Sequence, residues 1–585
     1  MKTFKIILIL TIGGIVFFTL NTIFALLRKL SNGLITFEQL NRSASENIFN
    51  LQGFSTNLAD IGLAVVPALL LMLFLAVKFF DNRRRRPGVE HGSARFAKPK
   101  ELQKYADLTN KKNNHLFAIG AILNLDARKH HRNLNVLVIG GSGSGKSRFY
   151  VSPNLYQANT SFVVTDPKGE LYRAFKKYLT LEGYSVRCLN LIDFASSAKY
   201  NPLAYFNPEQ PEVDCMILTE NIISNTNGSK PSSGDSFWEK AEKALLNALV
   251  TYTYFTSWNE DEEITSLDEE GKSYTRINPA NPATLIKVVD LLSQMQAFEK
   301  DDESQSYVDI IFETVKDWID IYDNALDKDQ WGKEAIETIN GLRFAYSQYR
   351  TYSQGAGETK KSVIISLGVR LAPLHMSQIR ELLSADEVGL NTIGMDKTAL
   401  FLIIPDTHAT FSFLISILYE QMFEKNLYIA DHQENGRLPV MIQCFMDEFA
   451  NIGKMPSFER KIAVMRSRGI STSVIVQNYS QGKALYKDDW ETIVGNCDST
   501  LFLGGNETKT TETISKMLGK ETIISNDTSV SKGRTGSSSI SERSIGRELL
   551  TPSEIGEIPS TNCIYFLRGE RPYMGKKLPA PPIMN

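Results

Sequence analysis

The residues whose types and spacing most clearly indicate a chemical role form a glycine-rich loop in the amino-terminal half of the chain. Gly140-x4-Gly145-Lys146-Ser147 has the spacing of a phosphate-binding loop, and an apolar run precedes it while a helical pattern follows. Glycines allow backbone N–H groups to turn toward a phosphate, and the amino terminus of the next helix adds to the same positive field. Lys146 can reach the β- and γ-phosphates, and the Ser147 hydroxyl can bind Mg²⁺. The predicted nucleotide-binding residues are Gly140, Gly141, Ser142, Gly143, Ser144, Gly145, Lys146 and Ser147.

A pair of acidic residues further along the chain fits the same chemistry. The apolar run that starts at Pro439 ends in Asp447-Glu448. We expect Asp447 to hold Mg²⁺ through water and Glu448 to polarise the attacking water. A carboxylate pair after a strand is common, and it could also cap a helix start, so the upstream phosphate-binding loop is what makes the assignment specific. The sequence therefore predicts an ATP hydrolase that uses ATP and Mg²⁺.

Three further polar residues are candidates for the same site. Gln477 ends the next apolar run, where it is expected beside the γ-phosphate; the alternative is a surface amide. Arg466 and Arg468 precede that run. In ring-forming motors an arginine in such a place reaches the γ-phosphate of the neighbouring subunit, and the alternative is a surface salt bridge. The sequence does not choose between the two arginines.

The elements that must position these residues are typical of an α/β protein. Short apolar runs rich in β-branched residues alternate with helical patterns, which implies a parallel sheet covered on both faces. The expected strands are Asn135–Gly140, Ser161–Asp166, Ser185–Leu191, Thr398–Asp406, Pro439–Glu448, Ser471–Asn478, Ser499–Asn506 and Asn562–Gly569.

Long helical patterns dominate from about Pro202 to Asp396, so the sheet is expected to be interrupted by a helical insertion. Within the insertion, the acidic stretch Asn259–Arg276 is predicted to be a loop. The Ser- and Gly-rich stretch Ser525–Ser544 is predicted to be a mobile loop.

The amino-terminal region contains two apolar segments long enough to span a bilayer. Ile6–Leu27 and Ile61–Phe80 each provide about 20 residues of helix, or ~30 Å. A cleaved signal peptide is disfavoured because no small-residue cleavage site follows the first segment and a second segment does. Arg83–Arg86 follows the second segment directly, so the positive-inside rule predicts that the N-terminus and everything after Arg86 are cytoplasmic. The loop from about 28 to 60 is then external.

Charge and cysteine content restrict the remaining possibilities. The chain has a net charge of −2; residues 1–90 contain 10 Lys and Arg against 5 Asp and Glu, which leaves −7 for the remainder. A mildly acidic body does not bind DNA by its whole surface, so any such contact must be a local basic lining or pass through a partner. No cysteine pair has CxxC spacing, which predicts buried reduced thiols in the cytoplasm and neither a zinc site nor a disulfide framework. The five cysteines are Cys188, Cys215, Cys444, Cys497 and Cys563.

Several segments together resemble the coupling proteins of type IV secretion and conjugation systems, the TraG/TraD family. The order of elements, two spans and then an interrupted motor, is also that of the family. The segments that carry the likeness are "HGSARFA" (His91–Ala97), "NLNVLVIGGSGSGKSRFYVSPNL" (Asn133–Leu155), "VVTDPKGELYR" (Val163–Arg173), "YNPL" (Tyr200–Leu203), "FWEKAEKALL" (Phe237–Leu246), "MDEFANIG" (Met446–Gly453) and "VQNYSQ" (Val476–Gln481).

The resemblance implies a RecA-like P-loop motor interrupted by an all-helical domain and assembled as a hexameric ring at the inner face of the plasma membrane. Such a motor would receive a relaxase–DNA complex and deliver single-stranded DNA to the secretion channel proteins using ATP. It also implies that the helical domain receives substrate and that Arg466 is the arginine acting in trans. For Asp166–Glu170, which matches a family segment, no role follows beyond a place near the nucleotide end of a strand. The implied domains are 1–87 (membrane anchor, with helices at about 6–27 and 61–80), 88–204 and 397–585 (the two parts of the motor), and 205–396 (the helical insertion).

The sequence departs from some family members in having a short external loop and no long acidic tail, so substrate choice is expected to lie in the helical domain or in an adaptor. Three alternatives remain. One is a coupling ATPase for protein effectors, and another is an FtsK-like DNA-pumping ATPase, which usually has more spans and a DNA-reading module. The third is a receptor that binds nucleotide only to assemble, and the presence of Glu448 argues against it.

Overall fold

The computed structural model describes residues 2–36, 38–39, 53–80, 86, 88–226, 236–258, 262–267, 273–278, 280–296, 305–531 and 537–584. The chain divides into two compact units, Met1–Glu90 and His91–Asn585. Arg83, Arg84 and Arg85, on which the predicted orientation rests, lie outside the described residues.

The first unit is a pair of apolar helices, α1 (Lys2–Ser31) and α3 (Leu58–Phe80). Both are long and apolar enough to cross a bilayer, by length and composition. They run antiparallel, because Lys5 near the start of α1 donates to the carbonyl of Phe79 (3.0 Å), while Arg28 near its end pairs with the buried Asp60 (3.0 Å). The helices approach closely at Gly13, where a Cβ would lie 2.3 Å from Met72.

The second unit is built on a nine-stranded sheet with the order β15-β14-β11-β3-β10-β9-β4-β8-β5. All eight strands expected from the sequence are present in it. The strands from β11 to β5 are parallel, whereas β14 pairs antiparallel with β11 and with β15. The strands are β3 (Val136–Ile139), β4 (Ser161–Thr165), β5 (Ser185–Asn190), β8 (Thr398–Ile403), β9 (Ile442–Met446), β10 (Ile470–Val476), β11 (Ser499–Phe502), β14 (Asn562–Leu567) and β15 (Tyr573–Lys576).

Every residue of the central strands β3, β9 and β10 is buried, because helices and loops cover both faces of the sheet. Alternate residues of β3 belong to two different cores: Leu137 and Ile139 to one, Val136 and Val138 to the other. Elements around the sheet include the strands β1 (Asn114–Ala118) and β2 (Ala121–Asn124), and the helices α4 (Pro99–Gln103), α5 (Ser152–Leu155), α6 (Glu170–Leu181), α14 (Ser412–Asp431), α15 (Phe458–Arg468), α16 (Tyr479–Tyr486), α17 (Asp489–Gly495), α18 (Thr508–Leu518) and α19 (Pro552–Gly556).

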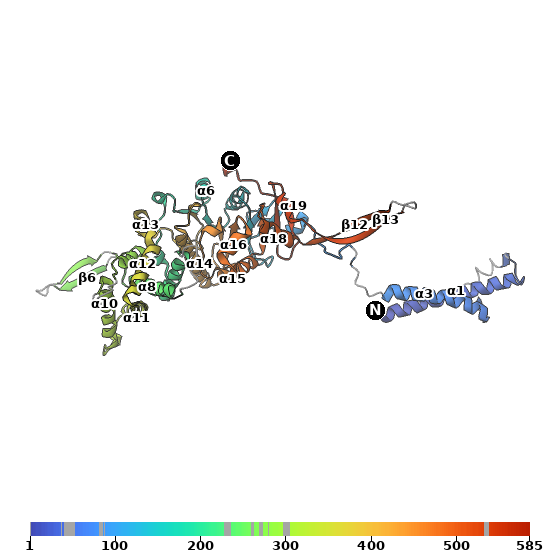
Figure 1. The fold of residues 1–585 in the computed structure, drawn as a ribbon, viewed down its shortest axis with the longest axis horizontal. Helices are drawn as coiled ribbons and strands as arrows, with labels where there is room; N and C mark the ends of the chain where they lie inside the picture. The colour runs from blue at the N-terminus through green and yellow to red at the C-terminus, as the bar shows by residue number, and fades with distance from the viewer. Residues whose placement is uncertain are drawn as a thin grey trace. The chain divides into compact units, whose positions relative to one another are not determined.

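Between β5 and β8 the chain is mostly helical, and this segment contributes no strand to the nine-stranded sheet. Figure 1 shows its helices gathered at one end of the second unit. They are α7 (Pro211–Thr226), α8 (Ser236–Phe255), α9 (Leu285–Ser293), α10 (Tyr307–Asp323), α11 (Lys333–Ser353), α12 (Gly357–Leu371) and α13 (Ser377–Leu382).

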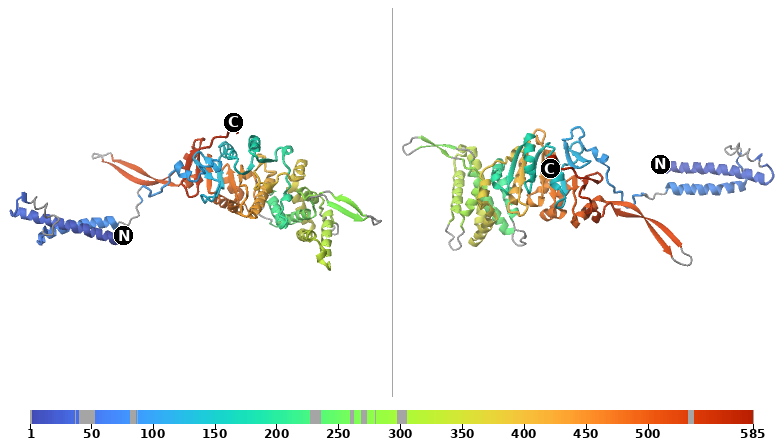
Figure 2. Two further views of the ribbon diagram at one scale, coloured as in Figure 1. Left: turned by 180° about the vertical axis from the view of Figure 1, so that it is seen from behind. Right: turned by 90° about the horizontal axis from the view of Figure 1, so that it is seen from above.

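Two stretches predicted as loops form hairpins instead. In the insertion, β6 (Glu262–Leu267) pairs with β7 (Ser273–Asn278) where the sequence indicates a loop. The Ser- and Gly-rich stretch contributes to β12 (Lys520–Ser531) and β13 (Ser537–Glu548), which pair over their full length; its residues 532–536 lie outside the described residues. In both cases β-branched residues placed among polar ones favour the extended backbone, and local composition alone misses this. The views in Figures 1 and 2 place β12–β13 at the opposite end of this unit from β6–β7.

The five cysteines are free thiols, and all except the half-buried Cys497 are buried, as the sequence predicts. Burial raises the pKa of Cys188 and of Cys215 to about 12, so neither thiol ionises near neutral pH.

Candidate functional site

The glycine-rich loop leaves β3 at the carboxyl edge of the sheet and turns sharply back toward it. Gly143 and Gly145 have φ angles of 76° and 82°, a left-handed conformation that glycine adopts without steric cost. The loop is fixed to the neighbouring strand connection because the amide of Gly141 donates to the carbonyl of Gly504 (2.9 Å). The expected helix begins as a π-helical turn, Ser147–Val151, followed by α5. The loop is therefore held at both ends by ordered structure.

Lys146 and Ser147 point toward the acidic pair Asp447-Glu448, which directly follows β9. The Lys146 ammonium is buried; it donates to the carbonyl of Gly140 (3.1 Å) and lies 3.4 Å from Glu448 Oε1. The Ser147 hydroxyl donates to Asp447 Oδ2 at 2.5 Å. Four of the residues singled out in the sequence thus meet at one point, although 300 positions separate Ser147 from Asp447.

Asp447 is almost fully buried, with 3% of its surface exposed. Burial raises the pKa of its carboxyl above the usual range, although the Ser147 hydroxyl and the Lys146 ammonium act in the opposite direction. Its Oδ1 accepts from the backbone amide of Glu448 (3.0 Å). A buried carboxylate beside a serine hydroxyl offers the hard oxygen ligands that Mg²⁺ prefers.

Glu448 and Gln477 face each other because their strands are neighbours. β10 lies between β3 and β9, so the residues that follow β9 and β10 emerge side by side at the carboxyl edge. Gln477 Nε2 donates to both carboxylate oxygens of Glu448, at 3.1 and 3.0 Å. The backbone amide of Gln477 in turn donates to Gln481 Oε1 (3.0 Å). The Glu448 carboxylate is thus held between an amide and the Lys146 ammonium.

Arg466 and Arg468 lie away from this cluster. They end α15, which enters β10 at the opposite edge of the sheet, and neither lines the cavity of the site. Arg468 is engaged with Asp431 through two hydrogen bonds of 2.7 and 3.0 Å. The half-buried Arg466 guanidinium makes no hydrogen bond or ion pair with any residue that the structure describes. Of the two guanidinium groups, only that of Arg468 is held in an ion pair within the described part of the chain.

The cluster opens into a cavity of about 530 Å³. Five charged residues that the sequence analysis did not assign to the site also line it: Arg148, Asp166, Lys168, Glu170 and Asp406. Burial raises the pKa of Asp166, whose Oδ2 accepts from the amide of Tyr172 (2.9 Å). Asp166 and Asp406 each follow an apolar run, which is the same signal that pointed to Asp447.

Lys577, near the end of the chain, supports the loop from the other side. Its buried ammonium donates to the carbonyl of Ser144 (2.8 Å), and burial lowers its pKa. No local pattern in the sequence marks this residue, because it reaches the loop only through the pairing of β14 and β15 at the edge of the sheet.

The residues present fit a nucleoside triphosphate with Mg²⁺. The buried Ser144 hydroxyl has no hydrogen-bond partner among the described residues, as expected of a group that faces a phosphate. Within the same residues, no group of three or more His, Cys, Asp and Glu side chains is arranged to hold a metal ion. Mg²⁺ in nucleotide sites typically takes one or two protein oxygens and completes its shell with phosphate and water, and the pair Ser147 and Asp447 suits that pattern.

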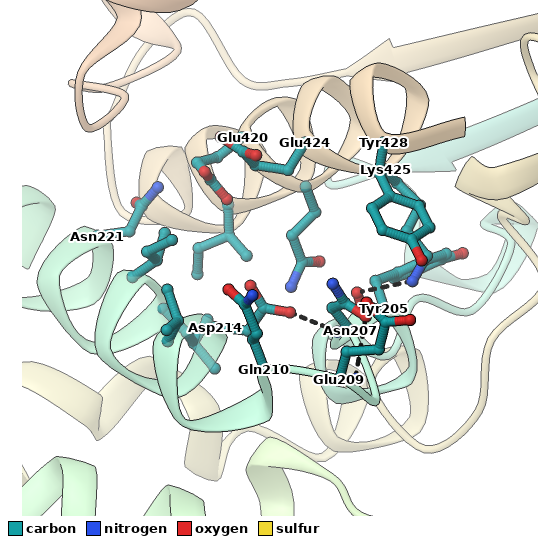
Figure 3. A pocket seen from close by; sticks show the side chains of 15 residues that line it. Tyr205, Asn207, Glu209, Gln210, Asp214, Asn221, Glu420, Glu424, Lys425 and Tyr428 are labelled. Atoms are coloured by element: carbon teal, nitrogen blue, oxygen red, sulfur yellow. Dashed lines mark hydrogen bonds between the residues drawn. The ribbon is translucent and has the colours of Figure 1, made fainter. Parts of the chain in front are cut away.

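A second cavity, of about 300 Å³, lies between α7 and α14 (Figure 3). Glu420 and Glu424 on α14 project toward it, and both pair with Lys461 of α15. Burial lowers the pKa of Lys461, but the two carboxylates outweigh it and hold the pKa above its usual value. These ion pairs tie α14 to α15, two helices that pack beside the nine-stranded sheet.

The carboxyl end of α7 also holds the loop that follows Glu448. Asn225 Oδ1 accepts from the amide of Lys454 (2.6 Å), and its Nδ2 donates to the carbonyl of the same residue (2.9 Å). Ser416 of α14 donates to that carbonyl as well (3.0 Å). The fit is close, because a Cβ at Gly453 would lie 2.6 Å from Asn225 Oδ1. One helix therefore links the insertion to the loop that carries Glu448.

Comparison with known proteins gives one consistent result. The family model for type IV secretory system conjugative DNA transfer matches residues 95–579. Conjugal transfer protein TraG of Escherichia coli is 23% identical over 539 residues, which cover 86% of this chain and 76% of that protein. Protein VirD4 of Agrobacterium fabrum is 20% identical over 545 residues, which cover 90% of this chain and 70% of that protein.

Solved structures share the fold. The unbound bacterial conjugative coupling protein TrwBdeltaN70 aligns with a TM-score of 0.55 at 14% identity, covering 86% of this chain and 98% of that one. TrwB in complex with ADP and Mg²⁺ aligns with a TM-score of 0.53 at 14% identity, covering 83% and 93%. The arrangement of a P-loop motor sheet with an inserted helical region is therefore shared with these proteins.

Proposed function

Because this chain belongs to the type IV secretory system conjugative DNA transfer family, we propose that it is a membrane-anchored ATPase that couples a relaxase–DNA complex to the secretion channel. The cargo in this proposal is single-stranded DNA with its attached relaxase. The second partner is the set of channel proteins, to which the motor delivers the cargo at the expense of ATP.

ATP and Mg²⁺ are the proposed ligands of the cavity at the carboxyl edge of the sheet. Two solved structures with the same fold hold ADPNP, and ADP with Mg²⁺, and this supports the proposal. The amides of the loop from Gly140 to Gly145 would bind the β-phosphate, and Lys146 would bind the β- and γ-phosphates. Ser147 and Asp447 would hold Mg²⁺, which bridges the phosphates and neutralises the charge that develops on them.

Glu448 is the proposed general base. Its carboxylate lies 3.4 Å from Lys146 Nζ and accepts two hydrogen bonds from Gln477. A phosphate that takes over the Lys146 contact would leave Glu448 free to accept a proton from the attacking water. Gln477 would keep the carboxylate aimed at that water and respond to the γ-phosphate beside it.

The site is proposed to be completed by a neighbouring subunit in a hexameric ring. Arg466 is half-buried, its guanidinium makes no hydrogen bond or ion pair with the described residues, and it does not line the cavity of its own subunit. These features suit an arginine that reaches the γ-phosphate of the next subunit and stabilises the transition-state charge. Arg468 suits this role less well, because its guanidinium is already paired with Asp431.

We also propose that α1 and α3 span the plasma membrane, with the N-terminus and the motor in the cytoplasm. Support comes from their length and apolar composition and from the run Arg83–Arg86 that follows the second helix. In the proposed division of the chain, 1–87 is the anchor, 88–204 and 397–585 form the motor, and 205–396 is the helical domain that receives the cargo.

The observation that carries the proposal is the meeting of Lys146, Ser147, Asp447, Glu448 and Gln477 in one cavity. The test is the ATPase rate of the full-length protein in lipid nanodiscs, with and without single-stranded DNA. We expect no turnover from Lys146→Ala or Glu448→Gln, and we expect Glu448→Gln still to bind a fluorescent ATP analogue. Normal turnover by Glu448→Gln would overturn the assignment of the base.

Two exposed residues provide matched controls. Lys177→Ala on α6 and Glu557→Gln after α19 make the same chemical changes at exposed positions that do not line the cavity, and both should keep the parental rate. A mating assay in a deletion strain then separates the cargo classes. Restored DNA transfer by the parental gene but not by Glu448→Gln supports the coupling role, whereas undiminished transfer without the gene contradicts it.

A further inference from the structure

The helical insertion and the motor carry opposite charge. Residues 205–396 contain 33 Asp and Glu against 16 Lys and Arg. The rest of the chain after Glu90 contains 28 Asp and Glu against 38 Lys and Arg. The mild acidity of the whole is therefore the sum of a basic motor, at +10, and a strongly acidic insertion, at −17. A surface of that charge repels the phosphates of nucleic acid and attracts basic protein segments.

An apolar groove runs along the insertion between α8, α10 and α11. It has a volume of about 520 Å³, and its walls include Trp318, Ile321 and Trp331. Trp318 is 42% exposed and Ile321 is 60% exposed, although both face a hollow lined mainly by other apolar side chains. Beneath them, Ile339 and Leu342 belong to a small separate core shared by α10 and α11. The groove therefore has a firm apolar floor and an open apolar rim.

The apolar groove continues into an acidic hollow. A cavity of about 610 Å³ shares Phe255, Thr256 and Thr338 with the groove, so the two are adjoining halves of one depression. Glu334 and Glu337 line the second half, and both are exposed. α10, α11 and their connection (307–353) contain nine Asp and Glu against five Lys and Arg, so the acidity extends around the depression.

We propose that this two-part depression binds a segment of a protein partner that carries bulky apolar side chains next to lysines or arginines. The apolar side chains would fill the groove beside Trp318 and Ile321, and the cationic groups would face Glu334 and Glu337. The proposal rests on the coupling function, since it names the chemistry by which the insertion would recognise the protein part of the cargo. The proposed ligand is a protein segment and not nucleic acid, because the negative charge of the insertion repels phosphate groups.

The test measures binding without nucleotide, so its outcome is independent of hydrolysis and of the assignments in the ATP site. The probe is a fluorescein-labelled helical peptide of about 18 residues, with leucines and tryptophans on one face and lysines on the other. A second peptide of the same pattern has glutamate in place of every lysine. We expect the lysine peptide to bind the full-length protein in nanodiscs and the glutamate peptide to bind at least about tenfold more weakly. Equal binding of both peptides would overturn the charge argument.

The apolar half is tested by Trp318→Ser/Ile321→Ser, which should weaken binding of the lysine peptide at least about tenfold. Ile365→Ser/Val369→Ser is the matched control, because both residues are exposed apolar side chains on α12 away from the groove. The unfolding temperature of each variant verifies its fold. An equal loss of binding in the two pairs would place the peptide elsewhere.

The acidic half is tested by charge reversal. Glu334→Lys/Glu337→Lys should lose the lysine peptide and gain affinity for the glutamate peptide, an exchange that unfolding cannot mimic. Glu209→Lys/Glu358→Lys changes the charge of the insertion equally at exposed positions outside the depression and should leave the preference unchanged. A single-stranded oligonucleotide should not displace the peptide; displacement that depends on Trp318 would mean that the depression binds nucleic acid.

Discussion

At the scale of single residues, the conformation of Glu448 is the most informative feature of the site. Its φ and ψ angles are 52° and 51°, a left-handed conformation that costs a non-glycine residue free energy, of the order of 1–3 kcal/mol. The conformation is retained because the surroundings fix both the backbone and the carboxylate: the amide donates to Asp447, and the side chain accepts from Gln477. Strain held in this way would keep the proposed general base in one conformation.

We predict that Gln477→Ala lowers kcat for ATP hydrolysis while KM changes less than about twofold. Hydrogen bonds to a charged group contribute about 1.5–3 kcal/mol, so the expected loss is roughly ten- to a hundredfold. Steady-state ATPase kinetics measure both constants. The exposed Gln378→Ala in the insertion is the control and should match the parent. A rise in KM at constant kcat would instead assign Gln477 to ATP binding.

A second residue-scale prediction concerns His115, which is fully buried in β1 and contacts the Tyr150 hydroxyl (2.8 Å). Burial lowers its pKa to about 3. The unfolded chain therefore binds a proton near pH 6.5 that the folded chain does not. Above that pH the protonation of this histidine does not affect the free energy of unfolding. As the pH falls from about 6.5 toward 3, it lowers the free energy of unfolding by up to about 1.4 kcal/mol per pH unit.

His115→Gln has no proton to gain and should show a flatter decline in stability between pH 6.5 and 4.5. Urea unfolding of the full-length protein, followed by tryptophan fluorescence, measures the slope. The exposed His375→Gln is the control, and its pH dependence should follow that of the parent. Parallel pH profiles for the parent and His115→Gln would contradict the burial argument.

At the scale of elements, α7 connects the insertion region to the loop that follows Glu448. Its residue Asn225 holds both the amide and the carbonyl of Lys454, six positions after Glu448. No apolar run ends at Asn225 and no motif includes it, so the sequence does not indicate this role. A shift of α7 along its axis would move the loop that follows Glu448.

We predict that Asn225→Ala lowers kcat about tenfold without a comparable change in KM for ATP, because the loop of Glu448 loses two hydrogen bonds while the phosphate-binding loop does not. Asn225→Asp keeps the acceptor for the Lys454 amide and should fall between the parent and Asn225→Ala. The exposed Asn340→Ala on α11 serves as the control in the same ATPase measurements. Equal kinetics for Asn225→Ala and the parent would rule out this positioning role.

The sequence predicts the strands and the polar residues that follow them, but not the order of the strands in the sheet. Asp447, Glu448 and Gln477 could be found because each follows an apolar run, and such runs are buried parallel strands with their polar ends at one edge. The contact between Gln477 and Glu448 could not be found, since it depends on β9 and β10 being neighbours, and strand order is a long-range property. The residue roles assigned to these side chains stay predictions.

The hairpin β12–β13 is an element that the sequence does not predict. Its composition is that of a loop, and Ile524 and Ile540 are 68% and 71% exposed, so no buried alternation marks it as a strand. At the base of the hairpin, the amide of His91 donates to the Thr522 hydroxyl of β12 (2.9 Å), and Ser93 bridges to Glu521 of the same strand. Residues more than 400 positions apart meet there, and no local sequence pattern predicts such a contact.

At the scale of the whole molecule, the proposed orientation in the membrane is open to a direct test. All five native thiols are buried or half-buried, so an added exposed cysteine is the preferred site of labelling. We predict that Asn32→Cys, after α1, reacts with a membrane-impermeant maleimide in intact cells. Lys100→Cys, in α4, should react only after lysis. Both residues are exposed, so they form a matched pair. The reverse pattern would invert the proposed topology.

The division of charge between motor and insertion also limits how a composite cargo can sit on this protein. At physiological salt an electrostatic potential decays over about 8 Å, so the two charged regions recruit nothing from a distance. Each region acts only on a ligand that is already in contact with it. The acidic insertion attracts basic protein and repels nucleic acid, and the basic motor does the reverse. A particle that is basic protein at one end and nucleic acid at the other therefore has a single favourable polarity, with its protein end on the insertion and its strand on the motor. The order in which the two parts of the cargo enter a channel would then be decided at docking, before any ATP is hydrolysed.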